Sequence, residues 1–293
     1  EIVFAADGSV DSISPAGVHT AGRPGGGSSE VTQGTSANTI IEDGSYSSEI
    51  YVSTGDDENA LRVDGAEVTL NGITVRKDAG SSSNAENGDF YGVNAALLAT
   101  NGADVTIVNA DISSDAQNGN GVFSYGEGTT VNISDSVIET TGNCSGGLMT
   151  TGGGTMNASN LLIHTTGNSS AAIRSDRGGG TVNVTGGSYT IDSADDALHC
   201  DSATVIRGGS YTIATGDDAI HAETALTIAD GSIDISTSYE GLEAQDVAVL
   251  GGSIKMFATD DGINSAGGND NSGNGGRDEM APPPGGNPPP GGH

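Results

Sequence analysis

Acidic residues recur at a fixed spacing in the C-terminal third of the chain. Four copies of a short motif end in one or two acidic residues, a small residue and an apolar residue, and the apolar residues are 22, 22 and 21 positions apart. Aligned on the apolar residue, the acids fall into two neighbouring columns. One column holds Asp195, Asp217, Tyr239 and Asp260, and the other holds Asp196, Asp218, Glu240 and Asp261. Carboxylates grouped in this way are suitable ligands for Ca²⁺, which takes six to eight oxygen atoms from flexible sets.

Electrostatic repulsion is the argument for a bound cation. If the copies stack as β-strands do, neighbouring carboxylates lie about 4.8 Å apart and repel by roughly 3.5 kcal/mol at an effective dielectric constant of 20. Only two lysine or arginine residues, Arg207 and Lys255, lie between Asp192 and Asp261. We therefore expect Ca²⁺ bound to the acidic residues of both columns. The alternative is a solvated acidic surface that keeps the protein soluble.

A third column contains polar residues that directly follow the apolar residue. Its members are Arg174, His199, His221, Glu243 and Asn264. Because side chains alternate along a strand, we expect this column to point away from the core and to lie beside the acids. Together with an exposed Tyr239 ring, it would form a polysaccharide-binding surface on which sugar uronates complete the calcium shell. Zinc bound by His199 and His221 is a weaker hypothesis, because a catalytic zinc site normally has three protein ligands.

The elements that position these residues are predicted from the repeat itself. Short β-rich units with a fixed period form solenoids, in which each coil buries its apolar face against its neighbours. The apolar column Leu198, Ile220, Leu242 and Ile263 continues backwards through Ile173, Leu148, Val122, Leu97 or Leu98, and Leu61. Short alternating strands such as Val131-Asn-Ile follow each position. Three short strands per coil, without a hexapeptide period, predict an all-β protein: a right-handed parallel β-helix of about 9–10 coils.

Three regions are expected along the chain. Residues 1–36 would form an N-terminal cap and linker, with a capping strand at Ile2–Phe4. Residues 37–264 would form the β-helix, and the segment from Arg76 to Phe90 would protrude from it as a polar loop. Residues 265–293 are rich in Gly, Asn and Pro and have the composition of a tail or linker.

Net charge restricts the possible partners. The chain carries 39 acidic and 9 basic residues, a formal charge of −30, which argues against nucleic acid and anionic membrane surfaces as partners. No stretch approaches the roughly 18 apolar residues that span a bilayer, so membrane insertion is not expected. We expect an exported protein, secreted or displayed at the cell surface.

The segment 182–268 carries several distinct elements in order. They are Gly-Gly-Ser-Tyr-Thr-Ile, Asp-Asp-Ala-Ile-His-Ala, Ser-Tyr-Glu-Gly-Leu-Glu and Asp-Asp-Gly-Ile-Asn-Ser-Ala-Gly-Gly. In these elements the segment resembles a family of secreted clostridial carbohydrate-binding β-helix proteins with a pectate-lyase-like fold. The resemblance implies binding of calcium and of plant polysaccharides such as pectic acid or cellulose, without catalysis. Residues 57–181 resemble the generic β-helix coils of bacterial surface adhesins.

Two other functions remain open. The chain could be a structural adhesin or filament subunit, in which terminal segments join identical subunits head to tail. It could also be a pectate lyase or a polygalacturonase-like enzyme, since the pair Asp217 and Asp218 resembles the aspartate pair of polygalacturonases. The Gly-His-Gly and Arg-Ile-Lys motifs of that family are absent. For a lyase, Arg174 is the only arginine or lysine in the column that borders the acids. Four near-identical acidic coils suit repeated cation binding better than one catalytic centre, so a non-catalytic function is favoured.

Overall fold

The computed structural model describes residues 2–4, 10–13, 31–176, 179–184 and 186–265. The chain divides into two units, Glu1–Val31 and Thr32–His293. In the first unit, β1 (Ile2–Phe4) pairs antiparallel with β2 (Val10–Ile13). The sequence placed a capping strand at Ile2–Phe4, and the structure gives this strand a partner within its own unit.

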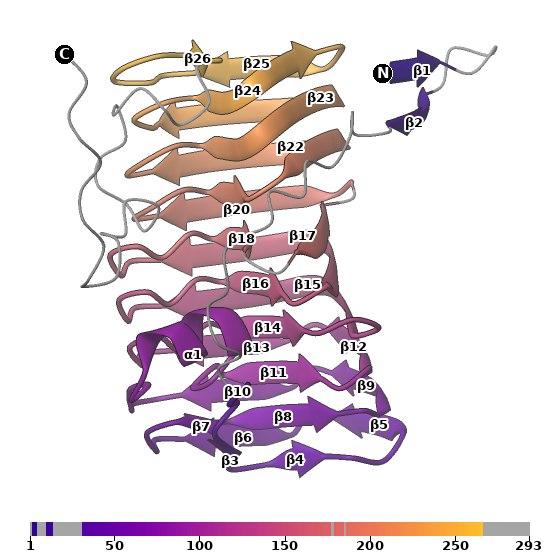
Figure 1. Cartoon of the computed structure of the whole chain (residues 1–293), viewed down its shortest axis with the longest axis vertical. Coiled ribbons are helices and arrows are strands. Elements are labelled where there is room, and N and C mark those ends of the chain that lie inside the picture. The colour runs from indigo at the N-terminus through magenta and orange to yellow at the C-terminus, as the bar shows by residue number, and fades with distance from the viewer. Residues whose placement is uncertain (1, 5–9, 14–30, 177–178, 185, 266–293) are drawn as a thin grey trace, which may run out of the picture. The chain divides into compact units, whose positions relative to one another are not determined.

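The second unit is an all-β solenoid with about nine turns, and it confirms the predicted right-handed parallel β-helix (Figure 1). Each full coil contributes one strand segment to each of three faces, and the segments of successive coils pair in parallel. Longer strands run through a corner and serve two or three faces. We call the faces A, B and C in chain order.

Face A contains β4 (Thr39–Ile40), β8 (Leu61–Asp64), β11 (Leu97–Thr100), β14 (Val122–Tyr125), β16 (Leu148–Thr151), β18 (Ile173–Ser175), β21 (Leu198–Cys200), the beginnings of β23 (Ile220–Thr237) and β24 (Leu242–Val249), and β26 (Ile263–Asn264). Face B contains β5 (Gly44–Ser47), β9 (Glu67–Asn71), β12 (Asp104–Val108), the beginnings of β15 (Thr130–Thr140), β17 (Gly154–Thr165) and β22 (Ala203–Thr215), β19 (Gly180–Val184), and later parts of β23 and β24. Face C contains β6 (Ile50–Ser53), β10 (Thr74–Lys77), β13 (Asp111–Ser114), β20 (Ser188–Ser193), β25 (Ser253–Met256) and the ends of β15, β17, β22 and β23. A separate pair, β3 (Thr35–Ser36) and β7 (Glu58–Asn59), precedes face A.

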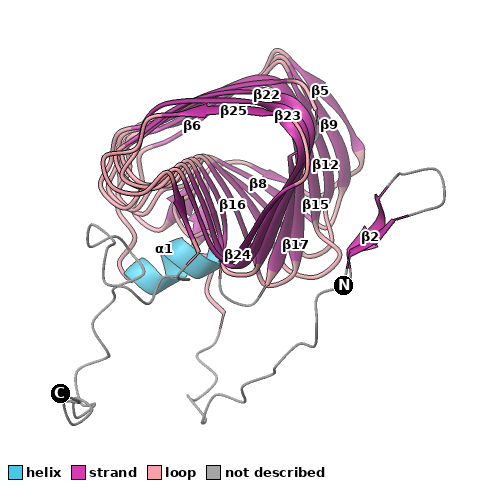
Figure 2. Cartoon of the chain, turned by 90° about the horizontal axis from the view of Figure 1, so that it is seen from above, coloured by secondary structure: helices cyan, strands magenta, loops and turns pink. Residues whose placement is uncertain are grey.

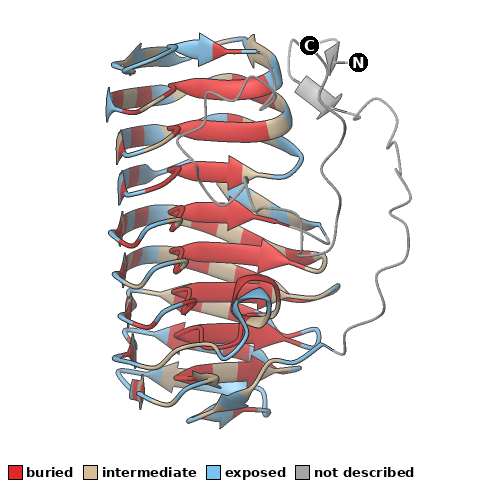
Figure 3. Ribbon diagram, turned by 60° about the vertical axis from the view of Figure 1, so that its left-hand side comes forward, coloured by how far each residue is buried: buried red, intermediate tan, exposed pale blue. Residues whose placement is uncertain are grey.

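The core follows from alternation of side chains along each strand. On face A, the predicted apolar column is in register from Leu61 to Ile263, with Leu97 rather than Leu98 as its second member. Buried residues run through the successive coils of the solenoid (Figure 3). On face C, the rings of Tyr189 and Tyr211 stack at 5.0 Å and are buried, and later coils have Ile233 and Ile254 at the same position. Burial of apolar side chains is the main stabilising contribution in such a stack.

The predicted loop from Arg76 to Phe90 is wrong at its start, because Arg76 and Lys77 belong to β10, and it is wrong in its second half. Residues Ala85–Tyr91 form a helix, α1, whose N-cap Asn84 accepts a hydrogen bond from the Glu86 amide at 3.0 Å. The helix ends at Gly92, which has a φ of 74° and lies against Leu98 and Phe123. In Figure 2, α1 lies outside the coils. The helix forms here because capping residues stand at both of its ends. The outer side of face A is also apolar beside it, at Leu98 and Phe123.

Candidate metal and ligand site

Two acidic columns stack at the corner that leads into face A, as predicted. In the outer acidic column (Asp195, Asp217, Tyr239, Asp260), the Tyr239 amide donates to the Asp217 carbonyl at 2.8 Å, and the Asp260 amide to the Tyr239 carbonyl at 3.0 Å. The inner acidic column consists of Asp196, Asp218, Glu240 and Asp261. Its first three members are buried, whereas Asp260 and Asp261 are exposed in the last coil.

The inner carboxylates have a structural role that sequence reasoning did not identify. Asp196 Oδ1 accepts the backbone amide of Asp218 at 3.0 Å, and Asp218 Oδ1 accepts that of Glu240 at 3.1 Å. Three coils before Asp196, the same position is Asn120, whose Oδ1 accepts the Gly146 amide at 2.9 Å. An uncharged side-chain oxygen therefore suffices for this hydrogen bond between coils. The hydrogen bond alone does not explain why residues 196, 218 and 240 are acidic.

The predicted polar column stands on the outer side of face A. In register it continues the column of Leu98, Phe123 and Met149, which are buried with Ala95 near α1. The polar members are Arg174, His199, His221, Glu243 and Asn264. All five are buried, with 3–7 % of the residue surface exposed to solvent. This burial does not fit the predicted role of the five as hydrogen-bond donors and acceptors at a polysaccharide surface, because a donor must be accessible to the glycan. Alternation predicted the side of the strand but could not show that this side is covered.

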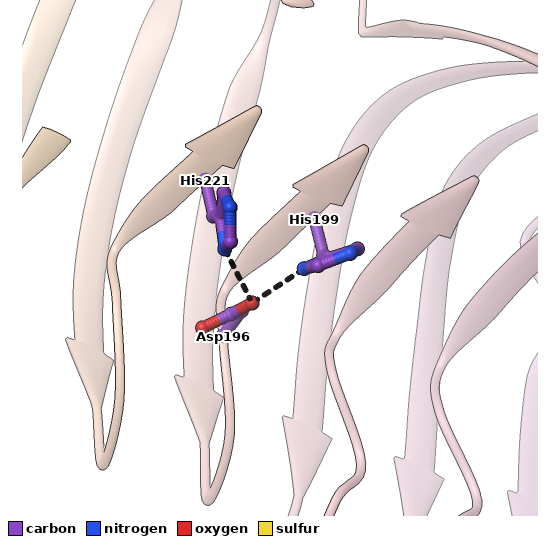
Figure 4. Close-up of side chains that lie close together, drawn as sticks. All are labelled: Asp196, His199 and His221. Atoms are coloured by element: carbon purple, nitrogen blue, oxygen red, sulfur yellow. Dashed lines mark hydrogen bonds and ion pairs between the residues drawn. The ribbon is translucent and has the colours of Figure 1, made fainter. Parts of the chain in front are cut away.

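Asp196 joins the two imidazoles of the polar column (Figure 4). His199 Nδ1 lies 2.7 Å from Asp196 Oδ2, and His221 Nδ1 lies 3.8 Å from the same oxygen. His221 Nδ1 is also 3.9 Å from Asp218 Oδ2 and 3.6 Å from Glu243 Oε2. The two imidazole rings are 4.8 Å apart at 72°. Residues from three successive coils thus meet at one point.

Burial and neighbouring charges shift the protonation equilibria of this cluster. Burial on its own raises the pKa of Asp196, but the hydrogen bond to His199 and the positive charges of His199, His221 and Arg174 bring it below the ordinary value. For His199, burial and Arg174 lower the pKa, but hydrogen bonds to Asp196 and Asp201 raise it to about 10. Burial, the charge of Asp196 and a hydrogen bond with Glu243 raise the pKa of Asp218 to about 10. Near neutral pH, the cation-free cluster therefore holds protons on His199 and Asp218.

Three groups of side chains bring possible metal ligands within 4.8 Å of one another: Asp195 with Asp196 and Asp217, Asp196 with His199 and His221, and Asp218 with His221 and Glu243. The first group offers oxygen alone. Since Ca–O bonds are about 2.3–2.6 Å long, two ligands of one calcium ion can lie up to about 5 Å apart. The first group therefore suits Ca²⁺. Of the other predicted calcium ligands, Asp218 falls in a group with imidazole, and Glu240, Asp260 and Asp261 fall in none of these three groups.

Carboxylates two positions beyond the polar column were not predicted as part of the site. Asp201 Oδ1 lies 3.4 Å from His199 Nε2, and Glu223 Oε1 lies 3.9 Å from His221 Nε2. One coil before His199, Arg174 Nε donates to Asp176 Oδ2 at 2.8 Å, and both side chains are buried. An acid two residues after each basic residue in three consecutive coils was the available sequence signal.

Comparison with known proteins gives no relative. No family model matches the chain, and neither the curated proteins nor the solved structures contain a match. Among the described residues, no helix is long and apolar enough to cross a membrane. The class of protein is therefore defined by the fold: the chain is an all-β parallel β-helix with two acidic columns and a buried polar column at one corner.

Proposed function

We propose that the protein is an extracellular, calcium-dependent polysaccharide-binding β-helix without catalytic activity. The observation that carries the proposal is the all-oxygen group of Asp195, Asp196 and Asp217, whose ligand atoms lie within 4.8 Å of one another. Hydrogen bonding between coils requires only an oxygen at position 196, as Asn120 shows three coils earlier. A bound divalent cation gives the repeated charges a function and offsets their repulsion.

Acidic polysaccharide is the ligand class that this site favours. Calcium takes six to eight oxygen ligands, so three carboxylates leave positions for water or for sugar uronates. Asp217 is half-buried, and Asp260 continues the same column to the exposed end of the solenoid. With a net charge of −30, the protein would repel a polyuronate unless cations bridge the two. Pectic acid is therefore the first ligand to test, and a cellulose-like neutral glycan is the second.

Binding is favoured over cleavage because of the position of Arg174. A lyase needs a basic group that reaches the proton beside the uronate carboxyl. Arg174 is 4 % exposed and its Nε is hydrogen-bonded to Asp176. We infer that this arginine holds the corner together and does not act as a base.

Assembly with identical subunits is a second candidate function. The last coil exposes large apolar side chains, with Phe257 at 63 % and Ile263 at 52 %, and the first coil exposes Ile41 at 70 % and Ile50 at 68 %. Open strand edges with apolar side chains favour pairing with another chain. End-to-end stacking of solenoids would suit a surface adhesin or a filament.

Electron microscopy and sedimentation at increasing concentration test this second function. Assembly predicts oligomers that disappear in Phe257→Asp and persist in Leu162→Asp, which changes an exposed residue in the middle of the solenoid. A native chain that stays monomeric at every concentration would remove the assembly hypothesis.

Polysaccharide binding is tested by co-sedimentation or calorimetry with polygalacturonate, in calcium and in chelator. We expect the native chain to bind in calcium alone and Asp195→Asn/Asp217→Asn to lose binding. The control Glu67→Gln/Asp111→Asn removes the same charge from exposed positions on faces B and C. It should bind as the native chain does. Binding that is equal with and without calcium would overturn the proposal.

A further inference from the structure

The two imidazoles of the polar column and Asp196 form a second, chemically different group beside the all-oxygen group. Asp196 Oδ2 lies 2.7 Å from His199 Nδ1 and 3.8 Å from His221 Nδ1. In a tetrahedral zinc site with bonds of about 2.0–2.2 Å, neighbouring ligands are about 3.3 Å apart. The two observed distances lie on either side of this value. The ligand atoms of the three residues lie within 4.8 Å of one another, so side-chain rotations would bring them to one ion.

We propose that Asp196, His199 and His221 bind a first-row transition-metal ion of the Zn²⁺ type, in addition to the calcium proposed at the outer corner. The donor set supports this choice, because imidazole nitrogen suits zinc, copper, iron and nickel, whereas calcium takes oxygen. All three side chains are buried, with exposures of 4, 3 and 7 %. Three protein ligands from three residues leave one coordination position for water or a ligand group.

The carboxylates behind the imidazoles provide independent support. Metal-binding histidines almost always direct their second ring nitrogen at a carboxylate, a carbonyl or water, which fixes the ring and raises its basicity. Here Asp201 faces His199 Nε2 at 3.4 Å, and Glu223 faces His221 Nε2 at 3.9 Å. The Nδ1 atoms of both rings therefore face Asp196. The same arrangement occurs in two consecutive coils.

The geometry also sets the stoichiometry. His221 Nδ1 lies near Asp218 Oδ2 and Glu243 Oε2 as well, so it belongs to two groups of possible ligands. One nitrogen binds one ion, and the two groups therefore cannot both be filled. The group with two imidazoles is preferred by zinc-type ions over the group with one. One transition-metal ion per chain follows for this corner.

The two proposed ions can be separated by variants. Asp195 and Asp217 belong only to the all-oxygen group, and neither His199 nor His221 belongs to that group. Asp196 is shared: its Oδ1 accepts the Asp218 amide, and its Oδ2 faces the imidazoles. Loss of calcium binding in Asp195→Asn/Asp217→Asn therefore says nothing against the zinc-type site, and the reverse also holds.

The test uses Co²⁺ absorption spectra and Zn²⁺ calorimetry on the full chain in excess calcium. We expect one Co²⁺ with the intense visible bands of a tetrahedral or five-coordinate nitrogen–oxygen site, displaced by Zn²⁺. His199→Ala and His221→Ala should lose these bands. His164→Ala is the control, because His164 is a half-exposed histidine 3.3 Å from Asp192 on face C. It should keep them.

Variants of Asp201 and Glu223 distinguish loss of metal binding from a folding defect. Asp201 and Glu223 have side-chain exposures of 36 and 43 %, so their replacement leaves the core intact. Asp201→Asn and Glu223→Gln should weaken Zn²⁺ binding about 10- to 100-fold, whereas Asp192→Asn should leave it unchanged. Absence of Zn²⁺ binding by the native chain, or equal binding by the native chain and the two histidine variants, would overturn the proposal.

Discussion

At the scale of single residues, the acidic columns combine a structural and a chemical task. Inner carboxylates accept the backbone amide of the next coil, and the same residues approach imidazoles or other carboxylates. The column positions could be predicted from the sequence because the period is nearly constant between Asp196 and Asp261. Burial of His199 and Glu243 could not, since alternation defines the side of a strand and not what covers it.

Position 196 separates the two tasks. Asp196→Asn keeps an oxygen that can accept the Asp218 amide, as Asn120 does for Gly146, whereas Asp196→Ala removes it. In chelator we expect Asp196→Ala to lose about 1–3 kcal/mol more in free energy of unfolding than Asp196→Asn, because a buried amide loses its partner. Urea denaturation measures both values. Equal losses would show that the hydrogen bond between coils contributes nothing.

A pH dependence follows from the shifted groups in the cation-free protein. His199 has its pKa raised from 6.5 to about 10, so the folded state holds its proton more tightly than the unfolded state. That contribution is complete below pH 6.5 and is lost as the pH rises towards 10. Burial also raises the pKa of Asp218 to about 10, so the stability that its bound proton contributes is likewise lost as the pH rises towards 10. The pKa of Asp196 is lowered, so its contribution is lost only in acid.

In chelator, urea midpoints should therefore fall between pH 7 and pH 9. The native chain is measured at each pH. His164→Ala, which removes a half-exposed histidine, is measured in the same way as a control. Midpoints that stay constant or rise over this interval would contradict the protonation scheme of the cluster.

At the scale of elements, the strands follow from the sequence and the helix does not. Alternating apolar residues and the repeat predict the three faces, because each coil must bury one side of every strand. The segment Ala85–Tyr91 is too short to show a helical period. Its flanking residues, Asn84 at the N-cap and Gly92 at the C-terminus, were the signal that could have revealed it.

Gly92 is expected to fix α1 against face A. A Cβ atom at this position would lie 2.7 Å from Leu98 Cδ1 and 3.0 Å from Phe123 Cγ, and the residue has a φ of 74°. Gly102, with a φ of 80° and no atom within 4 Å of its Cβ position, is the matched control. Gly102→Ala should cost roughly 1–2 kcal/mol for the left-handed backbone, and Gly92→Ala about 1–3 kcal/mol more for overpacking. Similar losses for the two variants in urea denaturation would show that α1 shifts to accommodate the added methyl group without a cost in stability.

At the scale of the whole molecule, composition and repeat predicted the class of fold, and the interactions at the corner define what it can bind. A net charge of −30 is compatible with partners that are neutral, cationic or bridged by cations. Within the solenoid, acids, histidines and Arg174 gather on the outer side of face A, beyond the apolar part of the same column. The two proposed ion sites therefore lie at one corner of the later coils.

Calcium calorimetry tests the central proposal most directly. Chelator-treated native protein, Asp195→Asn/Asp217→Asn and the control Glu67→Gln/Asp111→Asn would each be titrated with Ca²⁺ at fixed ionic strength. The account predicts saturable binding by the native chain and the control, with loss of at least one site in Asp195→Asn/Asp217→Asn. Absence of saturable binding by the native chain, or identical isotherms for all three proteins, would contradict it and leave the acidic columns as hydrogen-bond acceptors between coils.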